Sequence, residues 1–121
     1  MNKYVNTPKD IHIRIHKFVV ECFVSVVRII PKTPENIPII KQISASLTSI
    51  GANDQEADAA DSNKDFIAKY RIVKKEAKET KYWLTIIGDT KILANSVVEP
   101  YIREAQEILL IVSKIIINSG K

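Results

Sequence analysis

Apolar and small residues recur at helical spacing along most of this chain, and the clearest pattern runs from Phe66 to Ile87. Placed on a helix, one set of positions falls within about 100° of arc: Phe66, Tyr70, Val73, Ala77, Thr80, Leu84 and Ile87. Ser62, with Asp65 three residues later, has the form of a capping box at the start of a helix. Gly88 suits the position just after its end. The pattern predicts a long amphipathic helix over residues 62–87.

Three further segments, residues 10–30, 36–60 and 99–118, have apolar stripes at helical steps. Those stripes are Ile15, Val19, Cys22, Val26 and Ile29; Ile40, Ile43, Leu47, Ile50 and Ala57; and Ile102, Ala105, Leu109, Val112 and Ile116. The alternation at residues 11–16 would fit a strand by itself, but the residues after it have the helical period. Proline is tolerated in the first turn of a helix, so Pro38 and Pro100 mark two of the starts.

Some boundaries follow from single residues. Asp10 is a plausible N-cap for the first helix, and residues 1–9 read as a polar lead-in. Gly51 costs a helix about 1 kcal/mol relative to alanine, so the pattern leaves open whether the second helix passes through it. Residues 89–98 are predicted to be the longest connection.

Four helices joined mainly by short loops predict an all-α, up-down-up-down four-helix bundle. At 121 residues, the chain is predicted to form a single domain over residues 1–121. Residues 11–30 contain more apolar side chains than the roughly three in seven that a bundle helix needs. This excess predicts a second buried surface on the first helix, and self-association is the simplest way to cover it.

The chain carries a net charge of +4 and one cysteine, Cys22, which has no disulfide partner within the sequence. Cys22 lies among apolar residues, as expected of a buried thiol in a reducing compartment. The polar segment at residues 1–10 has no features of a secretion signal. No apolar run approaches the roughly 20 residues of a membrane span. We therefore expect a cytoplasmic protein without a membrane segment.

Several kinds of catalytic or metal site can be weighed against the sequence. His12 and His16 have the spacing at which two imidazoles can share a metal, but no third ligand is available, so they are interpreted as packing or interface histidines. Glu56, Glu76 and Glu79 lack the Glu-x-x-His pairs of a di-iron bundle. There is no G-x-S-x-G elbow and no glycine-rich phosphate loop. The sequence predicts no enzyme, no catalytic residue, no metal and no cofactor.

A basic row is the strongest candidate for a functional surface. Arg71, Lys74, Lys78 and Lys81 follow one flank of the predicted third helix at steps of three and four residues. Neighbouring like charges cost only about 0.2–0.5 kcal/mol each, so a simple solvated face is one interpretation. The other is contact with a phosphate backbone. Helping residues would be Lys75 and, on the first helix, Arg14, Lys17 and Arg28.

The segment from Ser49 onwards resembles a known family. Its members carry Ser-Ile-Pro-x-Asn-x-x-Glu-Gly on the second helix, then Ser-x-x-x-Phe and a later glutamate. The matching residues here are Ser49, Ile50, Asn53, Glu56, Ser62, Phe66 and Glu79. Gly51 and Ala57 stand where the pattern has proline and glycine. The chain thus resembles the small bacterial four-helix bundles of the rRNA intervening-sequence (S23-type) family.

This resemblance implies a left-handed bundle that assembles as a ring, with a pentamer expected, and no enzymatic activity. It also implies kinship with the accessory variability proteins of diversity-generating retroelements, which bind nucleic acid and a reverse transcriptase. Two hypotheses follow. The chain is an oligomeric accessory protein that binds RNA or RNA/DNA through the basic row, with a reverse transcriptase as a further partner. Alternatively, it is a protein-only scaffold whose basic row is solvated or paired across subunits with the acidic stretch Gly51–Asp61, in which charge reversal at Asp54, Glu56 and Asp58 would break the assembly.

Overall fold

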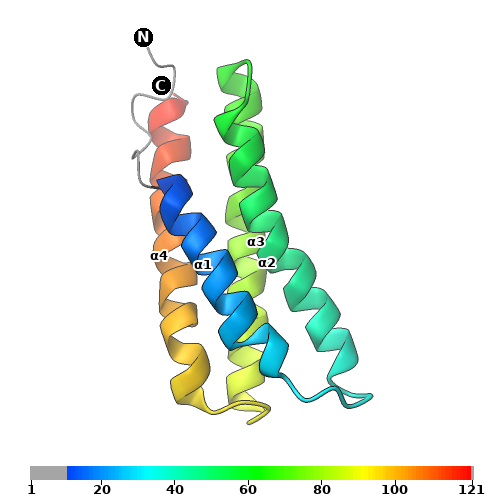
Figure 1. Ribbon diagram of the computed structural model, residues 1–121. Coiled ribbons are helices and arrows are strands. Elements are labelled where there is room, and N and C mark those ends of the chain that lie inside the picture. Colours follow the sequence, from blue (N-terminus) through cyan, green and yellow to red (C-terminus); the bar gives the residue numbers. More distant parts are fainter. Residues whose placement is uncertain (1–10, 121) are drawn as a thin grey trace.

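The computed structural model describes residues 11–120, which form an antiparallel bundle of four α-helices and contain no strand (Figure 1). The helices are α1 (Ile11–Ser25), α2 (Ile37–Asp58), α3 (Asn63–Asp89) and α4 (Asn95–Ser119), with a short 3₁₀ helix η1 (Val27–Ile29) after α1. Helix α1 packs against α2 and α4, and α3 packs against the same two helices. Helices α1 and α3 are therefore diagonal to each other. The predicted all-α four-helix bundle is confirmed, while assembly into a ring stays a prediction.

Helix α3 has the buried face that its sequence predicts. All seven positions of the predicted stripe, from Phe66 to Ile87, are buried. The predicted cap is also present, because the Ser62 side chain accepts a hydrogen bond from the backbone N–H of Asp65 at 3.1 Å. This helix is the central support of the bundle, since it packs along both α2 and α4.

The predicted end of this helix at Gly88 is wrong. Helix α3 continues through Gly88 to Asp89, and Gly88 does not have a positive φ. A Cβ atom at this position would lie 2.8 Å from Oδ1 of Asn95 and 2.9 Å from Cγ2 of Val98. The glycine therefore permits close contact between the end of α3 and the start of α4. The positive φ of this connection falls on Lys91 instead (62°).

Other boundaries also differ from the prediction. Helix α1 ends at Ser25 and is followed by η1, rather than running to residue 30. Helix α2 passes through Gly51 without a break and ends at Asp58 rather than residue 60, with a proline in its first turn as predicted. The N-cap prediction for Asp10 and the lead-in at residues 1–9 lie outside the part of the chain that is described.

The start of α4 was predicted too late. The helix begins at Asn95 rather than Glu99, so the predicted long connection over residues 89–98 is only residues 90–94. Pro100 was taken as the first helical residue, but it lies inside the helix. Proline has no N–H, so Pro100 cannot donate to the carbonyl group of Ser96, and one helical hydrogen bond is lost without ending the helix.

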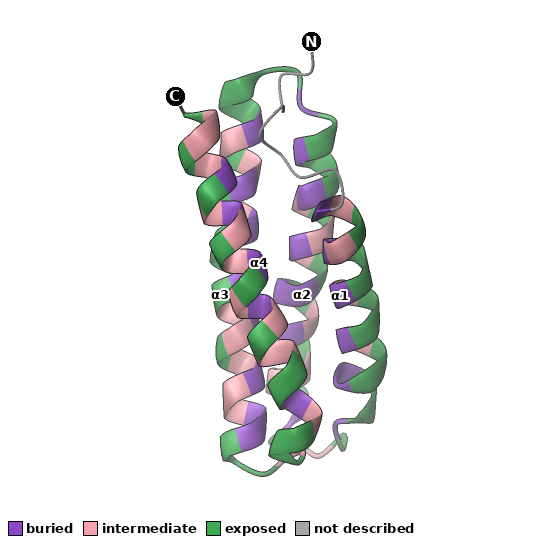
Figure 2. Ribbon diagram, turned by 90° about the vertical axis from the view of Figure 1, so that its left-hand side faces the viewer, coloured by how far each residue is buried: buried purple, intermediate pink, exposed green. Residues whose placement is uncertain are grey.

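The core lies along the faces where the helices meet, with exposed residues outside (Figure 2). On α2 the predicted stripe is buried at Ile43, Leu47, Ile50 and Ala57. On α1 and α4 the buried face is rotated about the helix axis relative to the predicted stripe. On α1, Val19 is only half-buried, and Ile29, which lies beyond the end of α1, is exposed. On α4, the half-buried members of the predicted stripe are Ile102, Leu109 and Ile116, and on α2 the half-buried member is Ile40. The buried apolar residues of α1 and α4 that lie outside the predicted stripes are Ile11, Phe18, Val98, Ile108 and Ile115.

The extra apolar residues of α1 lie on its outer face. Ile13 is 72% exposed, Val20 is 45% exposed and Val24 is 46% exposed. Their spacing of seven and four residues places all three on one side of the helix, opposite the core. Among residues 11–120, no helix combines the length and apolar character that crossing a membrane requires.

Candidate nucleic-acid interface

The basic row of α3 lines a groove between α3 and α4. The groove has a volume of about 440 Å³ and is bordered by Arg71, Lys74, Lys75, Lys78, Lys81, Gln106 and Leu109. We call this surface the basic groove. All five cations come from one flank of α3, while α4 contributes an amide and an apolar side chain. Helical spacing explains the row, because residues three and four apart share a face.

In the described part of the chain, residues 11–120, the cations of the basic groove have no acidic partners. Lys81 Nζ donates a hydrogen bond to Oε1 of Gln106 at 2.7 Å, which ties α3 to α4. Within residues 11–120, no carboxylate forms an ion pair with any of the five groove cations. Their mutual repulsion is therefore not offset within this part of the chain. An anion placed in the groove would offset it.

On the opposite flank of α3, one lysine forms an ion pair with α2. Lys69 Nζ lies 2.9 Å from Oε1 of Glu56 on α2. The hydrogen bond that Lys69 donates to Glu56, together with the negative charge of Glu56, raises the pKa of Lys69 above its ordinary value. Lys69 is thus paired with a carboxylate, whereas within residues 11–120 the groove cations are not, and the hydrogen bond of Lys81 goes to the neutral amide of Gln106.

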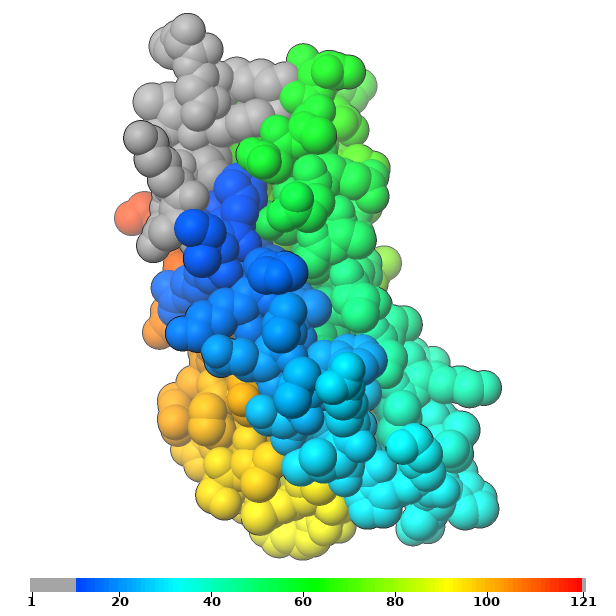
Figure 3. Space-filling model, in the orientation of Figure 1, coloured from blue at the N-terminus to red at the C-terminus, as the bar shows by residue number. Residues whose placement is uncertain are grey.

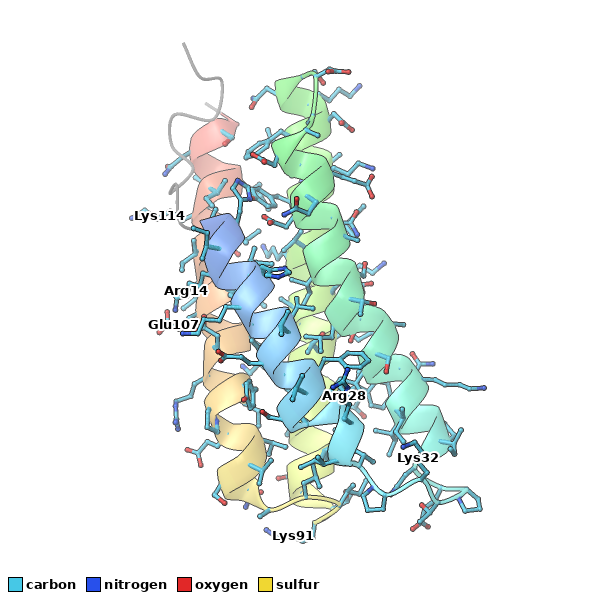
Figure 4. The ribbon with its side chains drawn as sticks, viewed as in Figure 1. Arg14, Arg28, Lys32, Lys91, Glu107 and Lys114 are labelled. Atoms are coloured by element: carbon cyan, nitrogen blue, oxygen red, sulfur yellow. The ribbon has the colours of Figure 1, made fainter. Side chains whose placement is uncertain are left out.

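The structure does not bring the basic residues of α1 to the basic groove. Helix α1 occupies the face seen in Figure 3, between α2 and α4, and lies diagonal to α3. Arg14 lies on α1 (Figure 4). Its Nε donates to Oε2 of Glu104 at 2.7 Å, and its Nη2 donates to Oε1 of the same residue at 2.9 Å. Lys17 lines a separate cavity beside this pair. The guanidinium group of Arg28 lies 6.0 Å from the centre of the Phe23 ring. These three residues belong to a different surface.

His12 belongs to a polar network around the buried Asp54. Its Nδ1 lies 2.9 Å from Oδ1 of Asp54, and the hydroxyl group of Tyr70 donates to the same oxygen at 2.8 Å. Its Nε2 lies 3.2 Å from Oδ1 of Asp58. Asp54 is only 1% exposed, and burial, followed by the charge and hydrogen bond of Asp54, raises the pKa of Tyr70. We call these four residues the Asp54 network.

The Asp54 network corrects one part of the sequence analysis. Asp54 was taken as a surface acid, available to a neighbouring subunit. It lies inside the bundle, where it joins α1, α2 and α3. The sequence did contain a signal for this, because Asp54 continues the helical steps of the buried residues Ile43, Leu47 and Ile50.

The remaining candidates for chemistry lie apart. His16 is exposed and borders a small cavity between α1 and α2. In residues 11–120, no group of three or more histidine, cysteine, aspartate and glutamate side chains is placed to hold a metal ion. Burial raises the pKa of Cys22 to about 12, so its sulfur is a neutral thiol near neutral pH.

The residues of the family motif stabilise the hairpin of α2 and α3. The Asn53 amide donates to the backbone oxygen of Ser49 at 2.9 Å and to its hydroxyl group at 3.0 Å. Glu56 pairs with Lys69 across the hairpin, and Ser62 caps α3. Phe66 is buried in edge contact with Tyr70, with ring centres 4.8 Å apart. Trp83 Nε1 donates to Oε2 of Glu79 at 3.3 Å.

Comparisons with known proteins agree with this architecture. The model of the family described as 23S rRNA-intervening sequence protein matches residues 10–114. The chain is similar to a protein of unknown function from the S23 ribosomal protein family of Bacteroides thetaiotaomicron VPI-5482, whose crystal structure superposes with a TM-score of 0.79. The two chains are 34% identical, and the match covers 88% of this chain and 94% of the other. No curated protein matches the chain.

Proposed function

This chain belongs to the 23S rRNA-intervening sequence protein family, and we propose that it is a non-enzymatic, oligomeric accessory protein that binds nucleic acid through the basic groove. One observation carries this proposal. Five cations line a single groove, and within residues 11–120 none of them has a carboxylate partner. A row of unpaired cations on a rigid helix is suited to the phosphates of a nucleic acid backbone, which release bound counterions when lysine and arginine neutralise them.

The proposal predicts a strong dependence on salt. If about four phosphates are met by each subunit, the logarithm of the affinity should fall against the logarithm of salt concentration with a slope near −3 for each subunit engaged. Fluorescence anisotropy with a labelled structured RNA measures this slope. A flat salt response would contradict the proposal.

A matched pair of variants locates the binding surface. The groove variant is Arg71→Gln, Lys74→Gln, Lys78→Gln and Lys81→Gln. The control variant removes the same charge from exposed positions outside the groove, and comprises Arg28→Gln, Lys32→Gln, Lys41→Gln and Lys114→Gln. We expect the groove variant to lose nearly all binding and the control to lose only the smaller effect of net charge. Equal losses in both variants would show that the groove has no special role.

Assembly into a ring is the second part of the proposal, and the outer face of α1 supports it. Three exposed apolar residues on one side of α1, Ile13, Val20 and Val24, form a stripe that a second copy could cover. Repetition of the groove around a pentamer would strengthen a weak single contact through avidity. Light scattering on the variant Val20→Glu with Val24→Glu tests this. The expected result is a fall in mass from oligomer to monomer, and an unchanged oligomer would exclude the stripe as the interface.

The same stripe favours a second candidate, a protein-only scaffold whose partner is another polypeptide. Among the acids of residues 51–61, Asp54 is buried and Glu56 pairs with Lys69 in its own subunit, which leaves the exposed Asp58 and Asp61 for contact with a neighbouring subunit. The scaffold hypothesis therefore depends on these two acids and, above all, on the apolar stripe of α1. It predicts that the groove variant keeps every partner, including a co-purified reverse transcriptase, while the α1 variant loses them.

A further inference from the structure

Among residues 11–120, charged side chains line the basic groove and no aromatic ring borders it. Its lining consists of five cations with Gln106 and Leu109. The exposed Tyr82 packs edge-on against Trp83, with ring centres 5.1 Å apart, and Trp83 is bonded to Glu79. Neither ring borders the groove. Proteins that hold single strands use aromatic side chains on which successive bases stack, worth about 1–3 kcal/mol per base. This groove offers no such platform.

The groove also has few groups that could identify a base. Gln106 is its one uncharged polar side chain, and its Oε1 already accepts a hydrogen bond from Lys81 at 2.7 Å. Base recognition depends on paired donors and acceptors presented in fixed directions to the base edge. What remains in the groove is one guanidinium group, that of Arg71, which has the planar fork that can read guanine, and four lysines, whose compact charges suit phosphate groups.

The cations form a straight and well-supported row. Arg71 and Lys81 are ten residues apart on one helix, which corresponds to about 15 Å along its axis. Each phosphate of one strand of B-DNA adds about 3.4 Å of rise along the duplex axis, so the length of this row equals the axial rise of about four phosphates. Val73, Ala77 and Thr80 are fully buried beneath the row, so the helix that carries it is anchored in the core.

From these observations we propose, on the basis of the function proposed above, that the basic groove takes the backbone of one strand of a duplex and reads its charge and shape without reading its sequence. A duplex presents phosphates that are already ordered, and about 0.9 counterions are released for each phosphate contacted, against about 0.7 for a single strand. A flexible single strand would also lose conformational freedom on binding. Without stacking, nothing in the groove would offset that loss.

The test compares duplexes with their own single strands, using the full chain. Short labelled RNA duplexes of about 16 base pairs are prepared in two unrelated sequences, with matching DNA duplexes and the separate unstructured strands. Anisotropy titrations at several salt concentrations give the affinity and the slope for each. We expect the duplexes to bind roughly tenfold tighter, with a slope near −3.6 against −2.8 for single strands when four phosphates are contacted. The two sequences should differ by less than about twofold, since shape readout is largely independent of sequence.

Comparing RNA duplexes with DNA duplexes shows which of the two nucleic acids the basic groove prefers. Equal binding to both supports recognition of the phosphates alone, and a preference for RNA duplexes supports an added contact to the 2′-hydroxyl group. The groove variant Arg71→Gln, Lys74→Gln, Lys78→Gln and Lys81→Gln should lose the duplex preference. The control Arg28→Gln, Lys32→Gln, Lys41→Gln and Lys114→Gln should keep it.

Three results would overturn the inference. Single strands that bind as tightly as duplexes would show that pre-ordered phosphates are not what the groove selects, and a large difference between the two duplex sequences would show base readout. Displacement of the duplex by polyglutamate at equal charge concentration would show that an acidic peptide fits as well. In all three cases the groove still binds an anion. Failure to bind any nucleic acid is a different outcome, because it also removes the proposed function.

Discussion

The junction of α1 with α2 contains a buried charge with hydrogen-bond partners, whereas the junction of α3 with α4 contains exposed charges that have no carboxylate partner within residues 11–120. At the first, Asp54 is buried, and its carboxylate accepts hydrogen bonds from His12 on α1 and from Tyr70 on α3. At the second, five cations lie around an open groove, and no carboxylate within residues 11–120 pairs with them. A buried charge must be partnered if the fold is to be stable. Exposed charges that the bundle leaves unpaired are therefore the ones available for an external ligand.

The two junctions also differ in how closely their backbones approach. A Cβ atom on Gly51 would lie 3.5 Å from Val19, which is an ordinary contact. On Gly88 it would lie 2.8 Å from Asn95 and 2.9 Å from Val98. The end of α3 is therefore packed more tightly on α4 than α2 is on α1. This close contact lies at the connection from α3 to α4, beyond the basic groove, while α1 carries the exposed apolar stripe suited to an interface.

The largest effect is expected from breaking the Asp54 network. Asp54→Ala leaves the Tyr70 hydroxyl group and the His12 ring without their acceptor, which should lower the free energy of unfolding by about 3 kcal/mol. Urea denaturation measures the change. Asp61→Ala, at an exposed acid nearby, should change stability by less than about 0.5 kcal/mol. Similar values for the two variants would show that the network is not what holds α1 in place.

A somewhat smaller effect tests the difference in backbone approach. Gly88→Ala must displace Asn95 and the buried Val98, and overpacking of this kind costs about 1–3 kcal/mol. Gly51→Ala introduces only an ordinary contact and should raise stability by up to about 1 kcal/mol through its better helix propensity. Thermal unfolding of the two variants should therefore shift in opposite directions. A stabilised Gly88→Ala protein would mean that the two junctions are equally loose.

These differences show which parts of the fold the sequence could predict. The buried face of α3 was predicted completely, because its apolar positions form one narrow stripe bordered by charges. The faces of α1 and α4 were not, because both helices have apolar residues on several sides and the pattern alone cannot choose among them. The start of α4 was misplaced because Pro100 is tolerated inside the helix, where tertiary packing offsets one missing hydrogen bond.

The candidate site was predictable on one helix only. Helical spacing within α3 was enough to predict the row, because residues three and four apart share a face; these residues are Arg71, Lys74, Lys78 and Lys81. Gln106 and Leu109 could not be predicted, since their place opposite the row depends on how α4 packs against α3. For the same reason the sequence could not show that α1, with Arg14 and Lys17, lies diagonal to α3, or that Arg28 lies in η1 beyond the end of α1.

A pH effect should separate the two junctions further. Tyr70 has a pKa raised by burial and by Asp54, whereas an unfolded tyrosine ionises near pH 10. The neutral phenol therefore contributes fully to stability below about pH 10, and this contribution falls as the pH rises above it, by about 1.4 kcal/mol per pH unit. Tyr70→Phe should remove this part of the slope in urea unfolding between about pH 10 and 11. Tyr82→Phe, at an exposed tyrosine, is the matched control and should leave the slope unchanged.

The smallest effect on stability is expected at the basic groove, and it has the opposite sign. Arg71→Gln, Lys74→Gln and Lys78→Gln keep the bond from Lys81 to Gln106 but remove like-charge neighbours that cost about 0.2–0.5 kcal/mol per pair. Helix propensity hardly changes, because arginine, lysine and glutamine are similar. The variant should be more stable than the parent by about 0.5 kcal/mol at low salt, and the difference should shrink at high salt because the repulsion is screened.

Measuring both stability and nucleic acid binding in this triple variant tests whether the groove cations serve a ligand or the fold. If the groove cations are maintained for a ligand, their loss should stabilise the bundle slightly while nucleic acid binding falls sharply. If the variant instead loses more than about 1 kcal/mol in urea unfolding, the cations support the fold through contacts of their own, since surface substitutions away from such contacts stay within about 0.5 kcal/mol. The contrast between a junction with paired charges and a junction with available charges would then no longer hold.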